Sequence, residues 1–193
     1  LEAMGEAVSP SREALALDKA PQELVILGGG VIGMEFASFF NSIGTRVTVI
    51  EMLPEILGAL DEEISAMLRA AYTAKGITFN FGCKVIAVEG NTVMFLSPEG
   101  EEKRVSAEKI LVSVGRRANT EGLGLETVGV EVSRGVKTDA HMRTNVPGIY
   151  AAGDVNGVSM LAHTASREGE VAVNHILGIP DQMSYAAIPG IVY

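Results

Sequence analysis

One stretch, Glu23 to Glu51, constrains the fold of this chain more than any other; it reads ELVILGGGVIGMEFASFFNSIGTRVTVIE. Leu24 to Leu27 is a short apolar run, which is typical of a strand buried on both faces. Glycines follow with the spacing G-x-G-x-x-G. Apolar residues then recur at helical spacing up to Gly44, which predicts the end of a helix; they are Ile32, Phe36, Phe39, Phe40 and Ile43. Arg46 to Ile50 is β-branched and predicts a second strand.

Each glycine of the motif has a separate physical reason. Gly28 permits a sharp exit from the strand, Gly30 lets the backbone approach a pyrophosphate, and Gly33 lets the helix pack closely on the strand. The start of the helix offers free N–H groups and the positive end of the helix dipole to phosphate. The predicted phosphate-binding loop therefore centres on Gly28, Gly30 and Gly33.

Glu51 stands at the end of the second strand, where it would accept hydrogen bonds from the adenosine ribose. It would also repel a 2′-phosphate, by about 4 kcal/mol per unit charge at about 4 Å and an effective dielectric near 20. No Arg or Lys occurs from Glu51 through Ala66 to receive such a phosphate. The stretch therefore predicts NAD(H) rather than NADP(H). The alternatives are an ordinary glycine-rich turn and an FAD site at the same loop.

Composition excludes several classes of protein. The net charge of −9 without a basic cluster argues against nucleic acid. The single cysteine, Cys83, excludes an internal disulfide and a cysteine-cluster metal site, and is expected to be a small buried residue at a strand start. His141 and His175 lack metal-ligand spacing, and His163 by itself suits the start of a helix better than a ligand or base. We therefore expect no metal. With no run of membrane-spanning length and no basic-then-apolar leader, we expect no membrane association and a cytoplasmic location.

The fold class expected is α/β: a Rossmann-like doubly wound parallel sheet with a three-stranded antiparallel β insert. A helix that begins at Ser9-Pro10 or at Ser11 and runs through Asp18, with Leu15 and Leu17 partly buried, is expected before the first strand. Another is expected after the second strand, with Asp61 as its N-cap, an end at about Lys75 and Gly76 as its terminator. The apolar face of the later helix is expected to comprise Ile64, Met67, Leu68 and Ala71. Further strands are expected at residues 77–81, 84–89, 92–96, 103–106 and 110–114.

Residues after Ala118 are loop-rich. Short strands are expected at residues 136–138, 142–144 and 149–152, the last of them buried, followed by a helix over 162–177 and an apolar strand from 187 to 193. The domains expected from these patterns are a leader and linking helix (1–19) and an NAD-binding domain (20–117).

Four segments, in order, carry a resemblance: APQELVILGGGVIGMEFASFFNSIGTRVTVIE, ILVSVGRRAN, GIYAAGDV and MLAHTASREG. They resemble the dihydrolipoamide dehydrogenases, members of the two-dinucleotide-binding disulfide oxidoreductase family. The resemblance implies NAD and FAD as cofactors of a parent enzyme. It also assigns residues 118–186 to the C-terminal piece of an FAD-binding domain and residues 187–193 to the start of a truncated interface domain. It also implies that this chain is a central fragment, because the first FAD-binding half, the redox-active cysteine pair and the H-P-E context of the catalytic histidine are not in it.

The resemblance implies further site residues, beginning with the rest of the NAD loop, Gly29, Val31 and Ile32. Glu35 would contact nicotinamide, or simply interact with the helix dipole, and Val85 would contact adenine, although apolar packing explains it better. Gly115 lies where open sheets bind ligands, but also suits a plain turn. Asp154 would hydrogen-bond the ribityl chain of FAD. A stretch lining the flavin would comprise Met160, Leu161, Ala162 and His163, and Thr164 departs from the lysine usual after it.

These observations predict an NAD(H)-binding fragment of a flavin-dependent dihydrolipoyl dehydrogenase, which oxidises dihydrolipoamide through a cysteine pair and FAD and delivers hydride to NAD+. The chain alone is expected to be inactive and colourless. Its expected partners are NAD(H), the missing halves of the parent and a second copy in a homo-oligomer. The alternatives are a stand-alone NAD-binding or assembly module, or a fragment of a related NADH oxidase or peroxidase. Residues 118–193 are expected to be disordered, repacked or buried in an oligomer.

Overall fold

The computed structural model describes residues 7–58 and 60–193, and the chain divides into two compact units. Unit 1 comprises the described residues up to Gly115 together with Gly190–Tyr193, and unit 2 comprises Arg116–Pro189. Each unit has its own buried apolar cluster.

Unit 1 is built on a five-stranded sheet in the order β1-β8-β2-β3-β4, and every neighbouring pair is parallel. The strands are β1 (Val8–Pro10), β2 (Glu23–Leu27), β3 (Arg46–Ile50), β4 (Thr78–Asn80) and β8 (Lys109–Val112). From β2 the chain moves outward to β3 and β4, and β8 then pairs with the other side of β2. The strand order therefore reverses between β2 and β8, which is the place where open α/β sheets bind ligands.

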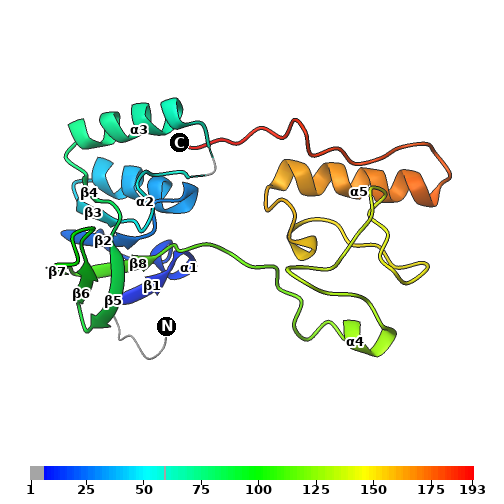
Figure 1. Cartoon of the computed structure of the whole chain (residues 1–193), viewed down its shortest axis with the longest axis horizontal. Helices are drawn as coiled ribbons and strands as arrows, with labels where there is room; N and C mark the ends of the chain where they lie inside the picture. The colour runs from blue at the N-terminus through cyan, green and yellow to red at the C-terminus, as the bar shows by residue number, and fades with distance from the viewer. Residues whose placement is uncertain (1–6, 59) are drawn as a thin grey trace. The chain divides into compact units, whose positions relative to one another are not determined.

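The two faces of this sheet are covered differently (Figure 1). Helices α2 (Val31–Ser42) and α3 (Glu62–Ala74) lie on one face, over a core that includes Met34, Phe40 and Tyr72. The other face carries an antiparallel sheet of β5 (Lys84–Glu89), β6 (Thr92–Leu96) and β7 (Glu102–Ser106). The predicted fold class, including the three-stranded insert, is confirmed.

Several local predictions in unit 1 are also confirmed. Gly44 follows α2 with φ +97°, and Gly76 follows α3 with φ +92°, so each ends a helix in the left-handed region. Asp61 caps α3 by accepting hydrogen bonds from the N–H groups of Glu63 and Ile64. Cys83 is buried immediately before β5, and this burial raises the pKa of its thiol.

The predicted buried faces of the two helices are partly wrong. On α2, Phe39 is 57% exposed and Ile43 is 50% exposed, because the helix meets the sheet through Gly33, Met34 and Ala37 instead. Small residues on that face allow the close approach. On α3, three of the four residues predicted to be buried are exposed, namely Ile64, Met67 and Ala71, and the fourth, Leu68, is half-buried; Ser65 and Tyr72 are buried instead. The buried face of α3 is the one that carries its largest side chain, Tyr72.

The N-terminal prediction is wrong in most respects. Helix α1 (Ser11–Ala14) is a single turn that does not reach Asp18, and Leu15 is 78% exposed, although Leu17 is half-buried against the first core. Before it lies β1, which was not predicted. Its partner β8 is about a hundred residues away in the sequence, with Val8 opposite Ile110. Such a pairing leaves no local signal, and Pro10 is tolerated because β1 is an edge strand.

Unit 2, all of whose residues are described, contains two short helical turns, α4 (Leu125–Val128) and η2 (Asp154–Asn156), and one long helix, α5 (Ala162–Ile176). The helix predicted over 162–177 is confirmed. The strands predicted at 136–138, 142–144 and 149–152 are wrong, because the unit has only isolated bridges, Val132–Val136 and Arg143–Tyr150. Residues 149–152 are also not buried, since each is half-buried or exposed. An apolar run forms a strand only where a neighbouring segment offers a continuous ladder of partners.

The strand predicted from 187 to 193 does not form either. Residues 190–193 belong instead to unit 1, where Val192 packs against the first core and the hydroxyl of Tyr72 donates to the Tyr193 carbonyl at 2.7 Å. That donation satisfies the polar tip of a side chain that is otherwise buried.

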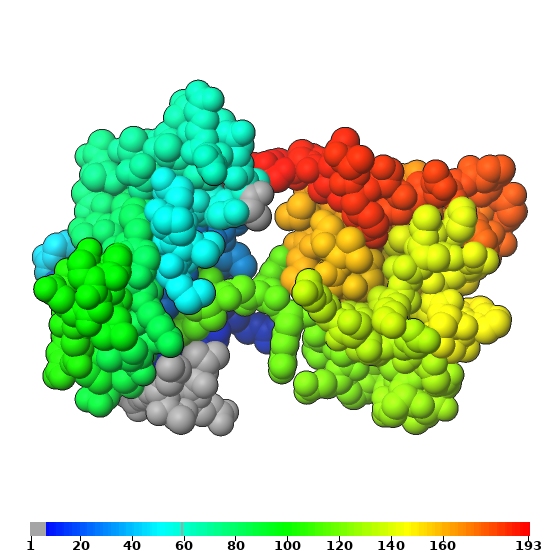
Figure 2. Space-filling model, in the orientation of Figure 1, coloured from blue at the N-terminus to red at the C-terminus, as the bar shows by residue number. Residues whose placement is uncertain are grey.

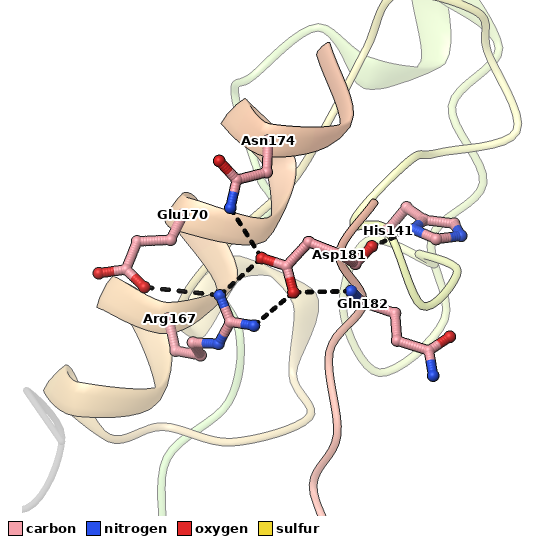
Figure 3. A network of polar contacts seen from close by, with 6 residues as sticks. All are labelled: His141, Arg167, Glu170, Asn174, Asp181 and Gln182. Carbon is pink, nitrogen blue, oxygen red and sulfur yellow. Dashed lines mark hydrogen bonds and ion pairs between the residues drawn. The ribbon is translucent and has the colours of Figure 1, made fainter. Parts of the chain in front are cut away.

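Residues 179–189, which we call the strap, lie along α5 (Figures 1 and 2). Figure 3 shows the polar contacts that hold it. Asp181 accepts a two-pronged ion pair from Arg167 at 2.8 and 2.5 Å and a hydrogen bond from Asn174 at 2.8 Å. The Asp181 carbonyl contacts Nδ1 of His141 at 2.7 Å. Met183 is buried against α5 and its N–H donates to the Ala140 carbonyl.

The strap should detach in acid. Hydrogen bonds from Arg167 and then Asn174 hold the pKa of Asp181 well below its usual range. A carboxyl group whose pKa is lower when folded stabilises the fold above its unfolded pKa of about 3.9, and this stabilisation is lost as pH falls below that value. We expect hydrogen exchange at Met183 to begin to accelerate, relative to the rest of unit 2, as the pH falls below about 5, and to go on accelerating below about pH 3, because the folded pKa of Asp181 lies lower still. Asp181→Asn should remove this pH dependence and Glu126→Gln, on α4, should leave it; an unchanged profile in Asp181→Asn would contradict the prediction.

Candidate dinucleotide-binding site

The glycine loop joins the end of β2 to the start of α2, and two of its glycines are required by the protein itself. Gly28 has φ +104°, and a Cβ there would lie 2.6 Å from the carbonyl oxygen of Ser113. A Cβ on Gly33 would lie 2.2 Å from the carbonyl oxygen of Gly28. The turn packs against the residue after β8, and the start of α2 packs against the turn, at distances that leave no room for a Cβ. The glycine spacing predicts this close packing.

Gly30 is different, because no protein atom lies within 4 Å of a Cβ built on it and its φ of −73° suits any residue. The space beside it is open to solvent. The first hydrogen bond of α2 runs from the N–H of Met34 to the Gly30 carbonyl at 3.0 Å, so the amides of Val31, Ile32 and Gly33 have no partner within the helix. The loop thus presents main-chain donors beside an open space, which fits a diphosphate.

Ser113, which the sequence reasoning missed, supports this loop. It follows β8, and its hydroxyl is 3.1 Å from the carbonyl oxygens of Leu27 and Gly28. A hydroxyl shared between these two carbonyls ties the end of β8 to the turn after β2. The only local signal is a polar residue directly after an apolar strand, and nothing in the sequence indicates what it contacts.

Glu51 lies directly beside the loop. Its carboxylate accepts hydrogen bonds from the N–H of Gly29 at 2.5 Å and from the N–H of Leu53 at 2.7 Å. The side chain is partly exposed, so the carboxylate is neither buried in the core nor directed away from the turn. This is the position that a ribose-binding acid requires.

The other predicted residues of unit 1 are placed as follows. Glu35 lies in the first turns of α2 and is half-buried, and its carboxylate has no hydrogen-bond partner among the described residues. Val85 is half-buried against the second core, opposite Phe95 on β6, which favours packing as its role. Gly115 follows β8 with φ +113°. The N–H of Cys83 donates to the Glu51 carbonyl, which places the start of β5 next to the end of β3.

In unit 2, the predicted flavin residues are connected by an arginine that the sequence reasoning did not single out. Arg116 forms an ion pair with Asp154 at 3.3 Å and donates to the Met160 carbonyl at 2.5 Å. Leu161 is the N-cap of α5, and Ala162 and His163, both exposed, begin it. Thr164 is buried and accepts a hydrogen bond from the Ser159 hydroxyl, so its departure from lysine leaves the helix start intact.

Glu168, in unit 2, is another residue that the sequence reasoning missed. It is completely buried and accepts hydrogen bonds from the N–H of Gly153, the amide of Asn156 and the hydroxyl of Tyr185. Burial and this carboxylate raise the pKa of Tyr185. The carboxylate thereby positions the Gly153–Asp154 turn. One sequence signal could have indicated Glu168: it is a charged residue on the inward face of the helix, among small and apolar neighbours.

Two histidines of unit 2 contact other side chains of that unit rather than forming a metal site. His141 and His175 have ring centroids 5.0 Å apart, and Nδ1 of His175 lies 2.8 Å from the Tyr150 hydroxyl. Over residues 7–58 and 60–193, no three His, Cys, Asp or Glu side chains group in a way that could hold a metal ion. No helix within those residues has the length and apolar character needed to cross a membrane.

A glycine turn at the switch point of a parallel sheet, with a carboxylate at the end of the next strand, is the arrangement of Rossmann-type dinucleotide-binding domains. The comparison with known families agrees: the model of the pyridine nucleotide-disulphide oxidoreductases matches residues 3–169. The chain belongs to the pyridine nucleotide-disulphide oxidoreductase family.

Individual relatives are similar over most of this chain. It is 46% identical to a dihydrolipoyl dehydrogenase of Acholeplasma laidlawii over 89% of its length, and 42% identical to one of Chlorobaculum tepidum over its whole length. Among solved structures, LpdA from Mycobacterium tuberculosis matches with a TM-score of 0.83 at 29% identity over 95% of this chain and 41% of its own. The chain spans 51% and 42% of the two curated relatives.

Proposed function

We propose that this chain is the NAD(H)-binding part of a flavin-dependent dihydrolipoyl dehydrogenase. The observation that carries the proposal is the Glu51 carboxylate at the mouth of a glycine loop whose outer side, at Gly30, is open. The relatives that are 46% and 42% identical bear the name of this enzyme. The whole reaction, from dihydrolipoamide to NAD+, belongs to the longer protein.

The residues present fit NAD(H) in two respects. The free amides of α2 and the space beside Gly30 would hold the diphosphate, and Glu51 would accept hydrogen bonds from the ribose hydroxyls of adenosine. Glu35, one turn into α2, would face the nicotinamide end. The dinucleotide, when bound, supplies the hydride chemistry, and the protein supplies binding and orientation.

The flavin-facing residues are proposed in unit 2. Asp154, held by Arg116, would contact the ribityl chain of FAD, and the main chain of residues 160–163 would line the flavin. The chain has a single cysteine and thus no redox-active pair. We expect it alone to be inactive with dihydrolipoamide and NAD+, and to act with the remaining parts of the enzyme in a homo-oligomer.

Calorimetric titration with NADH and NADPH tests the proposal. We expect NADH to bind at least about tenfold more tightly than NADPH, because the 2′-phosphate would lie against the Glu51 carboxylate. Glu51→Gln keeps an acceptor but removes the charge, and should bring the two affinities within about threefold of each other. Glu62→Gln, an exposed change on α3, is the matched control and should keep the preference. Equal affinities in the wild-type chain, or a preference that survives Glu51→Gln, would contradict NAD(H) selection by this residue.

A further inference from the structure

Unit 2 contains a cavity of about 470 Å³ into which three arginines project, Arg116, Arg117 and Arg134. Its size is in the range of small-molecule sites. Neither the proposed NAD(H) site nor the residues assigned to flavin explain the gathering of Arg117 and Arg134 there. In a chain with a net charge of −9 and only 15 Lys and Arg residues, a cavity with this many cations is unusual.

The wall of the cavity is rigidly built. A Cβ on Gly135 would lie 2.4 Å from the main-chain carbon of Asn156, and one on Gly157 would lie 3.0 Å from the Arg134 carbonyl oxygen. The N–H of Val136 donates to the Val155 carbonyl at 2.9 Å. The segment that carries Arg134 thus packs tightly against the end of η2. The position of the Arg134 backbone therefore does not depend on a ligand.

The three arginines differ in how far they are neutralised. Arg116 is engaged by Asp154 and by the Met160 carbonyl. Among the residues that the structure describes, Glu121 supplies the one carboxylate side chain that lines the cavity; it meets Arg117 only at 3.6 Å, and both side chains are more than 80% exposed, so this ion pair contributes little. Arg134 has no acceptor among the described residues, and the hydroxyl groups of Thr120 and Ser133, which also line the cavity, have none there either. Donors therefore outnumber acceptors in this cavity.

We propose that the cavity binds the phosphate group of a phosphate ester or diphosphate, through Arg117 and Arg134 with the hydroxyls of Thr120 and Ser133. Guanidinium groups pair with phosphate oxygens through two parallel hydrogen bonds, and hydroxyls donate to the oxygens that remain. A carboxylate ligand would use fewer of these donors, since it offers two oxygens rather than three or more. The proposal does not depend on the proposed binding of NAD(H).

The test is titration of the full chain with inorganic pyrophosphate, followed by the amide resonances of Ser133, Arg134 and Gly157 in NMR spectra. We expect these resonances to shift saturably, and the affinity to fall about tenfold in Arg134→Gln and in Arg117→Gln. Both side chains are exposed, so the melting temperature should stay unchanged. Lys137→Gln removes a charge from the same unit outside the cavity and should bind like the wild type.

Shifts confined to residues 28–33 would place pyrophosphate at the glycine loop and overturn the proposal, as would unchanged affinity in both arginine variants. A failure of NADH to bind would overturn the proposed function and leave this result untouched. Parallel titrations with inorganic phosphate and with FAD separate the two sources of the group. If FAD binds more tightly than pyrophosphate and Arg134→Gln weakens FAD binding, the cavity binds the diphosphate of a flavin. If pyrophosphate binds more tightly than FAD, the cavity binds a free phosphate compound.

Discussion

Replacing Gly33 by alanine is expected to destabilise unit 1 by about 3 kcal/mol, at the upper end of the usual cost of overpacking. The added Cβ would lie 2.2 Å from the Gly28 carbonyl oxygen and 2.8 Å from the Ser113 hydroxyl. Helix α2 must then move off β2, which opens the loop and misplaces the amides that we propose hold the diphosphate. Because the amides are misplaced, Gly33→Ala should also abolish NADH binding.

Gly30→Ala is the matched control, because it adds the same methyl group three residues earlier, where nothing lies within 4 Å. It should change the stability of unit 1 by no more than about 1 kcal/mol, the usual effect at an N-cap. It should nevertheless weaken NADH binding if the diphosphate approaches that side of the loop. Amide hydrogen exchange resolved over β2 and α2 measures the first effect and calorimetry the second. Equal stability of the two variants would contradict the close packing at Gly33.

Replacing Glu168 by alanine is expected to destabilise unit 2 by about 3 kcal/mol. The side chain is completely buried, and its removal leaves the N–H of Gly153 and the amide of Asn156 without an acceptor. Each unsatisfied buried donor costs about 1–3 kcal/mol. The turn that presents Asp154 should loosen, and the strap should lose its contact at Tyr185.

Glu170→Ala, two residues further along α5, is the control for this change. Its carboxylate is 68% exposed and meets Arg167 only at 3.5 Å, so the loss should stay below about 0.5 kcal/mol. Glu168→Gln keeps one acceptor oxygen and should fall between the two. Hydrogen exchange over α5 and residues 153–157 separates this unit from unit 1. If Glu168→Ala and Glu170→Ala were equally stable, the buried carboxylate would not organise the turn.

Where an interaction is encoded within a short segment, the sequence was sufficient to predict it. The spacing of Gly28, Gly30 and Gly33 predicts the turn, because positive φ and the absence of a Cβ are properties of the residue itself. Alternating apolar residues predict β5 and β6, and Asp61 predicts the start of α3, since the cap contacts amides two and three residues away. The position of Glu51 at the end of β3 follows from the length of that strand.

What the sequence alone left open depends on partners far along the chain. The pairing of β1 with β8, the support of the glycine turn by Ser113, and the links from Arg116 to Asp154 and from Glu168 to Gly153 join segments 15 to about 100 residues apart. Periodicity predicts that a helix has an apolar face, but it does not specify which residues a neighbouring element will cover. It therefore did not predict that Phe39 is exposed and that Tyr72 is buried. The sequence thus determined the local geometry of the dinucleotide loop. Only the tertiary structure decided which side chains support that loop and which arginines meet in unit 2, because packing selects contacts that local conformation cannot specify.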